Sequence, residues 1–107
     1  MKKIASRIEF KQIIANDKPV LVDFYAEWCG PCQALLPILE TISQTYANDI
    51  VVAKVNVDEH PDLAAHFGVK SIPRVFIIKN NVIVDQFIGL HSPSEIDKKV
   101  KTALSLN

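Results

Sequence analysis

The chain has 107 residues, 49% of them hydrophobic, which suits one compact domain with a buried core. The 12 Lys and Arg residues balance the 12 Asp and Glu residues, so charge gives no basis for binding nucleic acid or an acidic membrane surface. No apolar run approaches the roughly 20 residues of a membrane span, and charges interrupt the apolar positions of a signal peptide. We therefore expect a cytoplasmic protein with no membrane partner. We also expect a single domain over residues 1–107 and a monomer.

The first helix is predicted to begin at Ser6, because Ser6 and Glu9 have the spacing of a capping box and apolar residues follow at helical intervals. It is expected to end at residues 17–19, where Asp, Lys and Pro occur in succession. Whether residues 3–5 form a short strand before this helix is left open by the pattern. Residues 20–26 (VLVDFYA) are nearly all apolar, which is typical of a strand buried on both faces.

A turn over residues 27–30 leads to a second predicted helix with Pro31 in its first turn, where the missing N–H costs nothing. Apolar residues at helical spacing continue this helix to about Ala47, and Pro37 inside it is expected to cause a kink. Residues 50–57 (IVVAKVNV) predict a second buried strand. Two strands joined by a helix make a βαβ unit, which we expect to be parallel and right-handed.

A short helix is predicted over residues 61–67, with Gly68 as its C-terminal stop. Two further strands are predicted over residues 74–79 and 82–88. Asn80-Asn81 between them is a two-residue turn compatible with positive φ, so these strands are expected to form an antiparallel hairpin.

The last helix is predicted to begin at Ser92, which forms a second capping box with Glu95 and is followed by a proline. Its expected apolar face consists of Ile96, Val100, Ala103 and Leu104. Together these elements predict an α/β fold. Its central mixed sheet combines a parallel βαβ unit with an antiparallel hairpin and carries helices on both faces.

The only two cysteines, Cys29 and Cys32, stand where the first buried strand passes into the second helix. Sites in open α/β sheets form at the carboxyl ends of strands, and a helix start offers free N–H groups and a positive dipole end that favour an anion. We therefore expect Cys29 to be the thiolate nucleophile and Cys32 to attack the mixed disulfide that results. A bridge across two residues removes little chain entropy, so a purely stabilising disulfide is a poor explanation.

The same cysteine spacing also occurs in zinc sites, which need two further ligands. The chain has no other cysteine, and His60, His66 and His91 show no paired ligand spacing. We therefore expect a redox pair and no metal site.

The run VDFYAEWCGPC, residues 22–32, resembles the signature of thioredoxins, and WCGPC is highly specific to that family. The similarity continues through KVNVD at 54–58, SIP at 71–73 and FIG at 87–89, and covers the chain from about residue 6 to 105. It implies a thioredoxin fold and a protein thiol–disulfide oxidoreductase, a general dithiol reductant with protein-disulfide reductase activity in electron transport and cell redox homeostasis. It also implies a redox-active Cys29–Cys32 disulfide, diverse disulfide-containing protein substrates and no bound cofactor, with electrons coming from NADPH through a separate flavin-containing thioredoxin reductase.

Asp23 and Lys54 interrupt the two apolar strands, and burying either charge alone is costly. They could form an ion pair that neutralises both, or reach the edge of the sheet. Alternatively, desolvation raises the pKa of Asp23, so that it accepts a proton from Cys32. The resemblance matches Asp23 to the buried acid of the family and Lys54 to its partner.

Pro73, taken alone, is a strand-entry proline, and ordinary X–Pro bonds are mostly trans. The resemblance instead implies a cis-proline facing the cysteines, with the Ile72 backbone exposed for pairing with an extended substrate segment. Trp28 could be a core aromatic, but its place beside Cys29 suits a partly exposed ring that shields the site. The expected apolar docking patch consists of Trp28, Gly30, Pro31, Ile72, Pro73, Gly89 and Leu90.

Three positions depart from the family pattern. Arg74 stands where the family usually has Thr, Gln33 replaces a frequent Lys or Arg, and Tyr25 stands where many relatives have a second Trp. None removes a catalytic group, so these positions bear on partner choice and redox poise.

Two other functions remain open: an exported or dedicated thiol–disulfide protein, and a binding module whose docking patch works without turnover.

Overall fold

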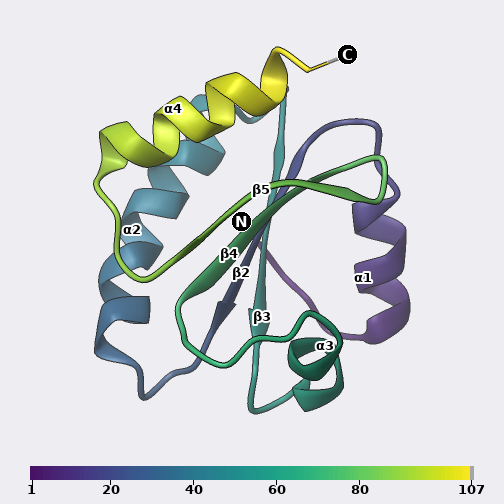
Figure 1. Cartoon of the computed structure of the whole chain (residues 1–107), viewed down its shortest axis with the longest axis vertical. Helices are drawn as coiled ribbons and strands as arrows, with labels where there is room; N and C mark the ends of the chain where they lie inside the picture. The colour runs from purple at the N-terminus through teal and green to yellow at the C-terminus, as the bar shows by residue number, and fades with distance from the viewer. Residues whose placement is uncertain (107) are drawn as a thin grey trace.

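The computed structural model describes residues 1–106 and contains one five-stranded mixed sheet with the strand order β1-β3-β2-β4-β5 (Figure 1). The strands are β1 (Lys2–Lys3), β2 (Val20–Tyr25), β3 (Val51–Asn56), β4 (Arg74–Lys79) and β5 (Val82–Ile88). The helices are α1 (Arg7–Ile14), α2 (Gly30–Thr45), α3 (Pro61–His66) and α4 (Pro93–Leu104).

The sheet is built around β2, every residue of which is buried. This strand pairs in parallel with β3 and antiparallel with β4, and β5 extends the sheet as the antiparallel partner of β4. The predicted combination of a parallel βαβ unit and an antiparallel hairpin is therefore confirmed. The apolar run of β2 is explained by its place between two strands and two layers of helices.

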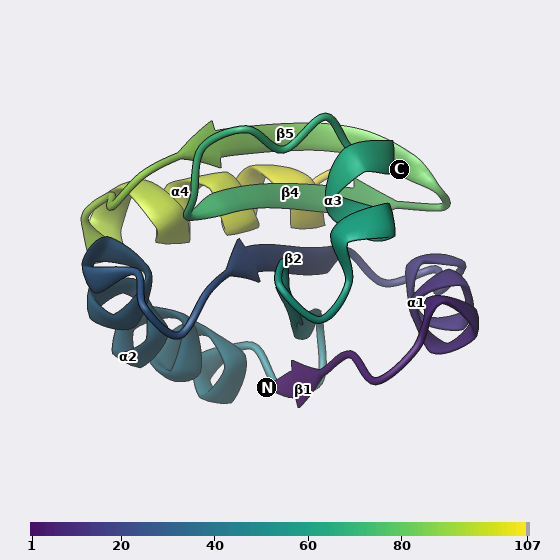
Figure 2. The same ribbon diagram turned by 90° about the horizontal axis from the view of Figure 1, so that it is seen from below.

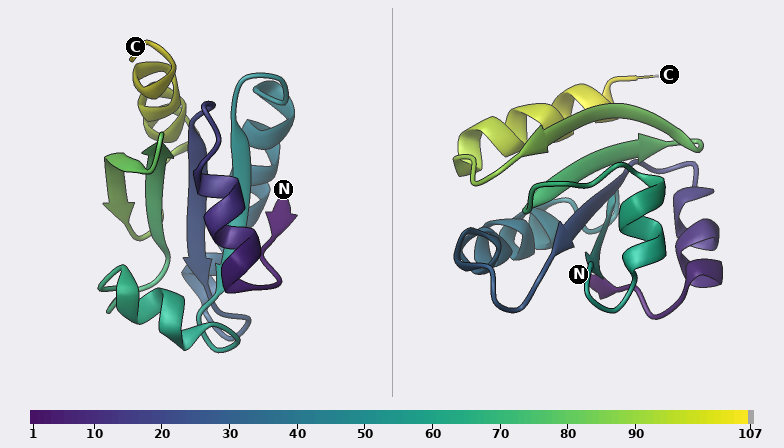
Figure 3. Two further views of the ribbon diagram at one scale, coloured as in Figure 1. Left: turned by 90° about the vertical axis from the view of Figure 1, so that its right-hand side faces the viewer. Right: turned by 60° about the horizontal axis from the view of Figure 1, so that its bottom comes forward.

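Helices α2 and α4 cover one face of the sheet, and α1 and α3 cover the other (Figures 1 and 2). Figure 3 (left) looks onto the face that α1 and α3 cover. Alternate residues of β2 serve the two cores: Leu21 packs with the buried residues of α2 and α4, whereas Val22 and Phe24 pack with those of α1 and α3. By this alternation, Asp23 and Tyr25 point to the α2 face.

Capping serines begin α1 and α4 at the predicted places. Ser92 and Glu95 form a complete capping box at α4. At α1 the Ser6 side chain accepts from the Glu9 N–H, but the Glu9 carboxylate accepts from the Ala5 N–H at 2.9 Å, so the reciprocal half of the predicted box is displaced by one residue.

The turn between β4 and β5 is also as predicted, because Asn80 and Asn81 have φ values of 52° and 65°. A short strand does precede α1, but it comprises residues 2 and 3 and not residues 3–5. This strand, β1, pairs in parallel with β3. Pro37 lies inside α2, which remains one continuous helix from Gly30 to Thr45. Within residues 1–106, no helix combines the length and apolar character that crossing a bilayer requires.

Candidate active site

The two cysteines form a disulfide at the start of α2, directly after the carboxyl end of β2, with their Cα atoms 5.2 Å apart. Cys29 is the N-cap of the helix, in an extended conformation, and Pro31 lies in the first turn. The chain adopts this geometry because β2 ends at Tyr25 and a short turn, with a Cys29 N–H to Ala26 carbonyl bond of 3.2 Å, leads into the helix. The expected strand–turn–helix setting of the pair is thus present.

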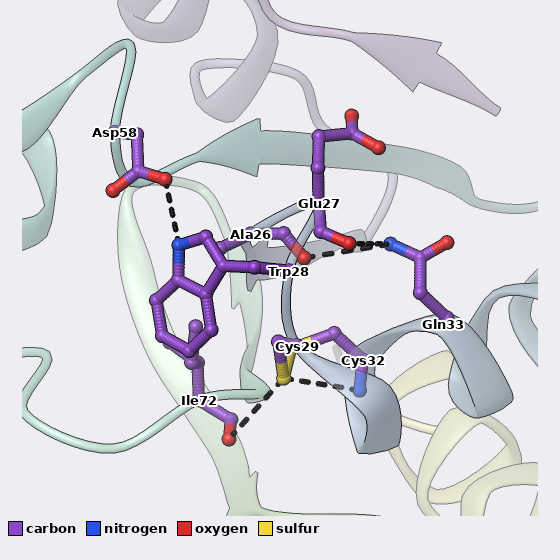
Figure 4. The surroundings of a disulfide bond; sticks show 8 residues. All are labelled: Ala26, Glu27, Trp28, Cys29, Cys32, Gln33, Asp58 and Ile72. Carbon is purple, nitrogen blue, oxygen red and sulfur yellow. Dashed lines mark hydrogen bonds between the residues drawn. A yellow bond between two sulfur atoms is a disulfide. The ribbon is translucent and has the colours of Figure 1, made fainter.

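The sulfur of Cys29 receives the polar contacts of the pair (Figure 4). The Cys32 backbone N–H donates to Cys29 Sγ at 3.2 Å, and the Ile72 carbonyl oxygen lies 3.9 Å from the same sulfur. Cys29 is 5% exposed, whereas Cys32 is 0% exposed. An N–H donor and a helix amino terminus both stabilise negative charge on Cys29, the more exposed of the two cysteines.

Trp28 is a surface residue and not part of the core, because its side chain is 72% exposed. Its indole Nε1 donates to Asp58 Oδ2 at 2.9 Å, and the ring lies between Asp58 and Ile72 in the view of Figure 4. Asp58 follows β3, the parallel neighbour of β2, and sequence reasoning did not assign it a role. The signal was present, since an acid just after a strand lies near the carboxyl end of the adjacent parallel strand.

The peptide bond between Ile72 and Pro73 is cis, as the family resemblance implied. The Gly89 N–H donates to the Pro73 carbonyl at 2.8 Å, with Gly89 at a φ of 81°. This bond places the segment after β5 beside the segment before β4. The Ile72 backbone forms no backbone hydrogen bond within residues 1–106, so it is open to pairing with another chain.

Three other residues of the expected docking patch are exposed. Gly30 and Pro31 are exposed at the start of α2, and Leu90 is exposed after β5. Pro73 itself is buried. The structure brings the patch together from the β2–α2 junction, the loop before β4 and the end of β5.

Asp23 is fully buried and neither carboxylate oxygen has a hydrogen-bond partner within the described chain. Burial raises its pKa to about 7, and the Lys54 ammonium opposes part of this rise. Lys54 is the neighbour of Asp23 across the parallel β2–β3 pair. A closed ion pair, which was one interpretation of the sequence, is not formed between them.

The three positions that depart from the family pattern each have defined contacts. The Gln33 amide donates to the carbonyls of Ala26 and Glu27 at 3.4 Å and so points back over the turn (Figure 4). The Arg74 guanidinium lies 4.8 Å from the centre of the Phe76 ring and donates a hydrogen bond to Gln86. These Arg74 contacts lie along the β4–β5 pair.

The third departure, Tyr25, is buried, and its ring lies beneath the Lys54 ammonium. The histidines are separate from one another: His60 contacts the Ile4 carbonyl and His91 contacts Glu95. Among residues 1–106, no three His, Cys, Asp or Glu side chains are arranged to hold a metal ion.

Comparison with known proteins points to one family. The sequence profile described as Thioredoxin matches residues 2–102. A thioredoxin of Chlorobaculum thiosulfatiphilum is 45% identical over 89 residues, which are 83% of this chain and 82% of the relative. The crystal structure of Malassezia sympodialis thioredoxin (Mala s 13) superimposes with a TM-score of 0.91 at 33% identity, covering 98% of this chain and 91% of that one.

A yeast structure that addresses the thiol resolving mechanism in mitochondrial 1-Cys peroxiredoxin via glutathione/thioredoxin systems is also similar. Its TM-score is 0.86 at 31% identity, with 95% of this chain and 94% of that chain covered.

Proposed function

The chain belongs to the thioredoxin family and is a protein thiol–disulfide oxidoreductase, and we propose that it is a general dithiol reductant in which Cys29 attacks and Cys32 resolves. The observation that carries these roles is the asymmetry of the pair. Cys29 caps α2, accepts the Cys32 N–H and is the more exposed cysteine, while Cys32 is fully buried behind it.

In the first step, the Cys29 thiolate attacks one sulfur of a substrate disulfide. A bond forms between Cys29 Sγ and that sulfur, the substrate S–S bond breaks, and the other substrate sulfur leaves as a thiolate that takes a proton from solvent. The Cys32 N–H and the helix amino terminus favour the attacking anion.

In the second step, Cys32 loses its proton and attacks Cys29 Sγ. The Cys29–Cys32 bond forms and the second substrate thiolate leaves, so the substrate gains two electrons and the protein is left as the disulfide present in the structure. We assign the proton to Asp23, because its pKa of about 7 is matched to proton transfer near neutrality. The Lys54 ammonium lowers the pKa of Asp23 and so favours its carboxylate form. A water molecule can relay the proton.

Substrate docking is assigned to the exposed apolar groups around Cys29. Trp28 and Leu90 offer surface, and the Ile72 backbone, which forms no backbone–backbone hydrogen bond within residues 1–106, offers hydrogen bonds to an extended segment. Backbone pairing next to an apolar surface needs no fixed substrate sequence, which suits diverse disulfide-containing proteins. Gly30, Pro31, Pro73 and Gly89 shape the same surface.

The oxidised pair must be reduced again in each cycle. We propose that a separate flavin-containing thioredoxin reductase supplies the electrons from NADPH, and that residues 1–107 act as one domain without a bound cofactor. We also propose that the protein works in the cytoplasm, where thiols are kept reduced.

The test is insulin reduction coupled to NADPH and thioredoxin reductase, with Cys29→Ser and Cys32→Ser as variants. Cys29→Ser is expected to abolish turnover, and Cys32→Ser to accumulate a mixed disulfide at Cys29 that mass spectrometry detects. Turnover by Cys29→Ser would refute the assigned roles. Equilibration against glutathione is expected to give a strongly reducing potential, and an oxidising one would favour a dedicated thiol–disulfide protein instead.

A further inference from the structure

The Lys54 ammonium contacts an aromatic ring and forms no closed ion pair with Asp23. Its Nζ lies 5.2 Å from the centre of the Tyr25 ring. Within residues 1–106 it forms no hydrogen bond with Asp23, whose two oxygens are both unpartnered. Lys54 itself is only partly buried, so its long side chain has access to water. The contact with the ring can therefore restrain the position of the ammonium relative to Asp23.

Tyr25 links Lys54 to the cysteine pair. Asp23 and Tyr25 are two residues apart on β2 and so share the face of the sheet that α2 covers. Tyr25 is 1% exposed and packs in one buried cluster with Cys29 and Cys32. Lys54, the β3 neighbour of Asp23, reaches over this ring. Tyr25 thus contacts both the cation and the redox pair, and it lies two residues along β2 from the acid.

We propose that Tyr25 is a positioning residue for the resolving step, whose ring holds the Lys54 ammonium where it favours the carboxylate form of Asp23. A cation is attracted to an aromatic face, and the attraction increases as the site is desolvated. Without the ring, the flexible lysine stem would carry its charge into solvent, where water screens its effect on a buried acid.

The hydroxyl end of Tyr25 faces a different set of charges. Lys3 from β1, Glu27 after β2 and Glu59 after β3 all act on it. Burial raises the pKa of the phenol above its usual value, so the ring stays neutral at physiological pH. The face of the ring, and not a charge on its oxygen, is therefore what acts on Lys54. Around Asp23, burial is the larger influence on the pKa and Lys54 is the charge that opposes it.

This role depends on the proposed function, in which Asp23 accepts the Cys32 proton. If loss of the ring raised the titration midpoint of Asp23 by one pH unit, the ionised fraction at pH 7 would fall about fivefold. The resolving step is then expected to slow about fivefold at pH 7 and to recover in alkaline solution, where Asp23 is ionised in either protein.

The first experiment measures the titration of Asp23 by carbon NMR of carboxyl-labelled aspartate in the oxidised protein, in which no cysteine titrates. Tyr25→Leu, with Tyr25→Met as a second ring-free variant, is expected to raise the midpoint. Tyr25→Phe and Tyr25→Trp, which keep an aromatic face, are expected to restore it. Phe24→Leu is the matched control, because Phe24 is equally buried on the same strand but points to the opposite face.

A double-mutant cycle with Lys54→Gln separates positioning from packing. Lys54→Gln alone is expected to raise the midpoint as Tyr25→Leu does, and adding Tyr25→Leu to it is expected to cause no further rise. A full additional rise in the double variant would show that Tyr25 acts by packing and would overturn the proposal. An unchanged midpoint in both ring-free variants would also overturn it.

The kinetic experiment mixes the reduced protein with 5,5′-dithiobis(2-nitrobenzoate), which releases one coloured thiolate on attack by Cys29 and a second on resolution by Cys32. Tyr25→Leu is expected to slow the second phase about fivefold at pH 7 and to leave the first phase within twofold. An unchanged second phase in Asp23→Asn would refute the proposed role of Asp23, whereas the NMR midpoints test Tyr25 independently of that role.

Discussion

Trp28 and Asp58 are joined by a hydrogen bond of 2.9 Å between the indole Nε1 and a carboxylate oxygen, although they are 30 residues apart in the chain. The bond connects the turn before α2 to the loop after β3. It holds the only tryptophan of the chain, with 72% of its surface exposed, beside the redox pair.

Asp58→Ala is expected to free this ring and so to lower the efficiency of insulin reduction. The expected decrease is about fivefold, which corresponds to the free energy of about 1 kcal/mol that one hydrogen bond contributes. Asp58→Asn, which keeps an acceptor oxygen, is the matched control and is expected to lose less. Because Trp28 is the sole tryptophan, its fluorescence anisotropy reports the ring directly. Unchanged anisotropy in Asp58→Ala would show that the bond does not restrain the ring.

The reduced protein is expected to be alkylated at Cys29 and not at Cys32. Cys29 is 5% exposed and its sulfur accepts an N–H at the start of α2, while Cys32 is 0% exposed. Brief treatment with iodoacetamide at neutral pH, followed by peptide mass spectrometry, should find one modified cysteine. Cys32→Ser should react as fast as the unaltered protein, and Cys29→Ser at least tenfold more slowly. Equal labelling of both cysteines would contradict the assignment of the nucleophile.

Asp23 is expected to destabilise the oxidised protein as the pH rises. Its folded pKa of about 7 lies above the ordinary value of 3.8, so between these values the folded state binds more protons than the unfolded state. Stability is therefore lost from about pH 4 to pH 7, by about 4 kcal/mol in total, and then levels off.

Asp23→Asn removes this dependence because the amide does not titrate. Urea unfolding of the oxidised protein should show the variant gaining stability over the unaltered chain between pH 4 and pH 7, with a constant difference at higher pH. A difference independent of pH would mean that Asp23 titrates normally in the folded protein.

Gly89 and Gly68 form a natural pair for separating stability from docking. Both have positive φ, 81° and 65°. Apart from the two adjacent residues in the chain, no heavy atom of residues 1–106 lies within 4 Å of the place a Cβ would occupy, so alanine at either position is strained by the backbone alone. Each Gly→Ala change is expected to cost about 1 kcal/mol of unfolding free energy. Only Gly89→Ala should also slow insulin reduction, because Gly89 donates to the Pro73 carbonyl beside the cysteines.

Equal slowing by Gly68→Ala would indicate that activity follows general stability. In that case the contact between Gly89 and Pro73 has no separate role in substrate docking.

Short-range patterns in the sequence determined most of the architecture. The apolar run of β2, the capping serines of α1 and α4, and the paired asparagines before β5 each act over a few residues, so their structures could be predicted locally. The cysteine pair at the start of a helix is equally local, because a strand end and a helix start are adjacent in the chain.

The tertiary structure decided the features that join distant segments. The pairing of β1 with β3, the bond from Trp28 to Asp58 and the stacking of Lys54 on Tyr25 all bring together residues more than 25 positions apart. The environment of Asp23 belongs here as well, since strands and helices from the whole chain exclude water from it. Desolvation and through-space charge depend on what surrounds a group in three dimensions, and no local pattern of residues specifies that surrounding.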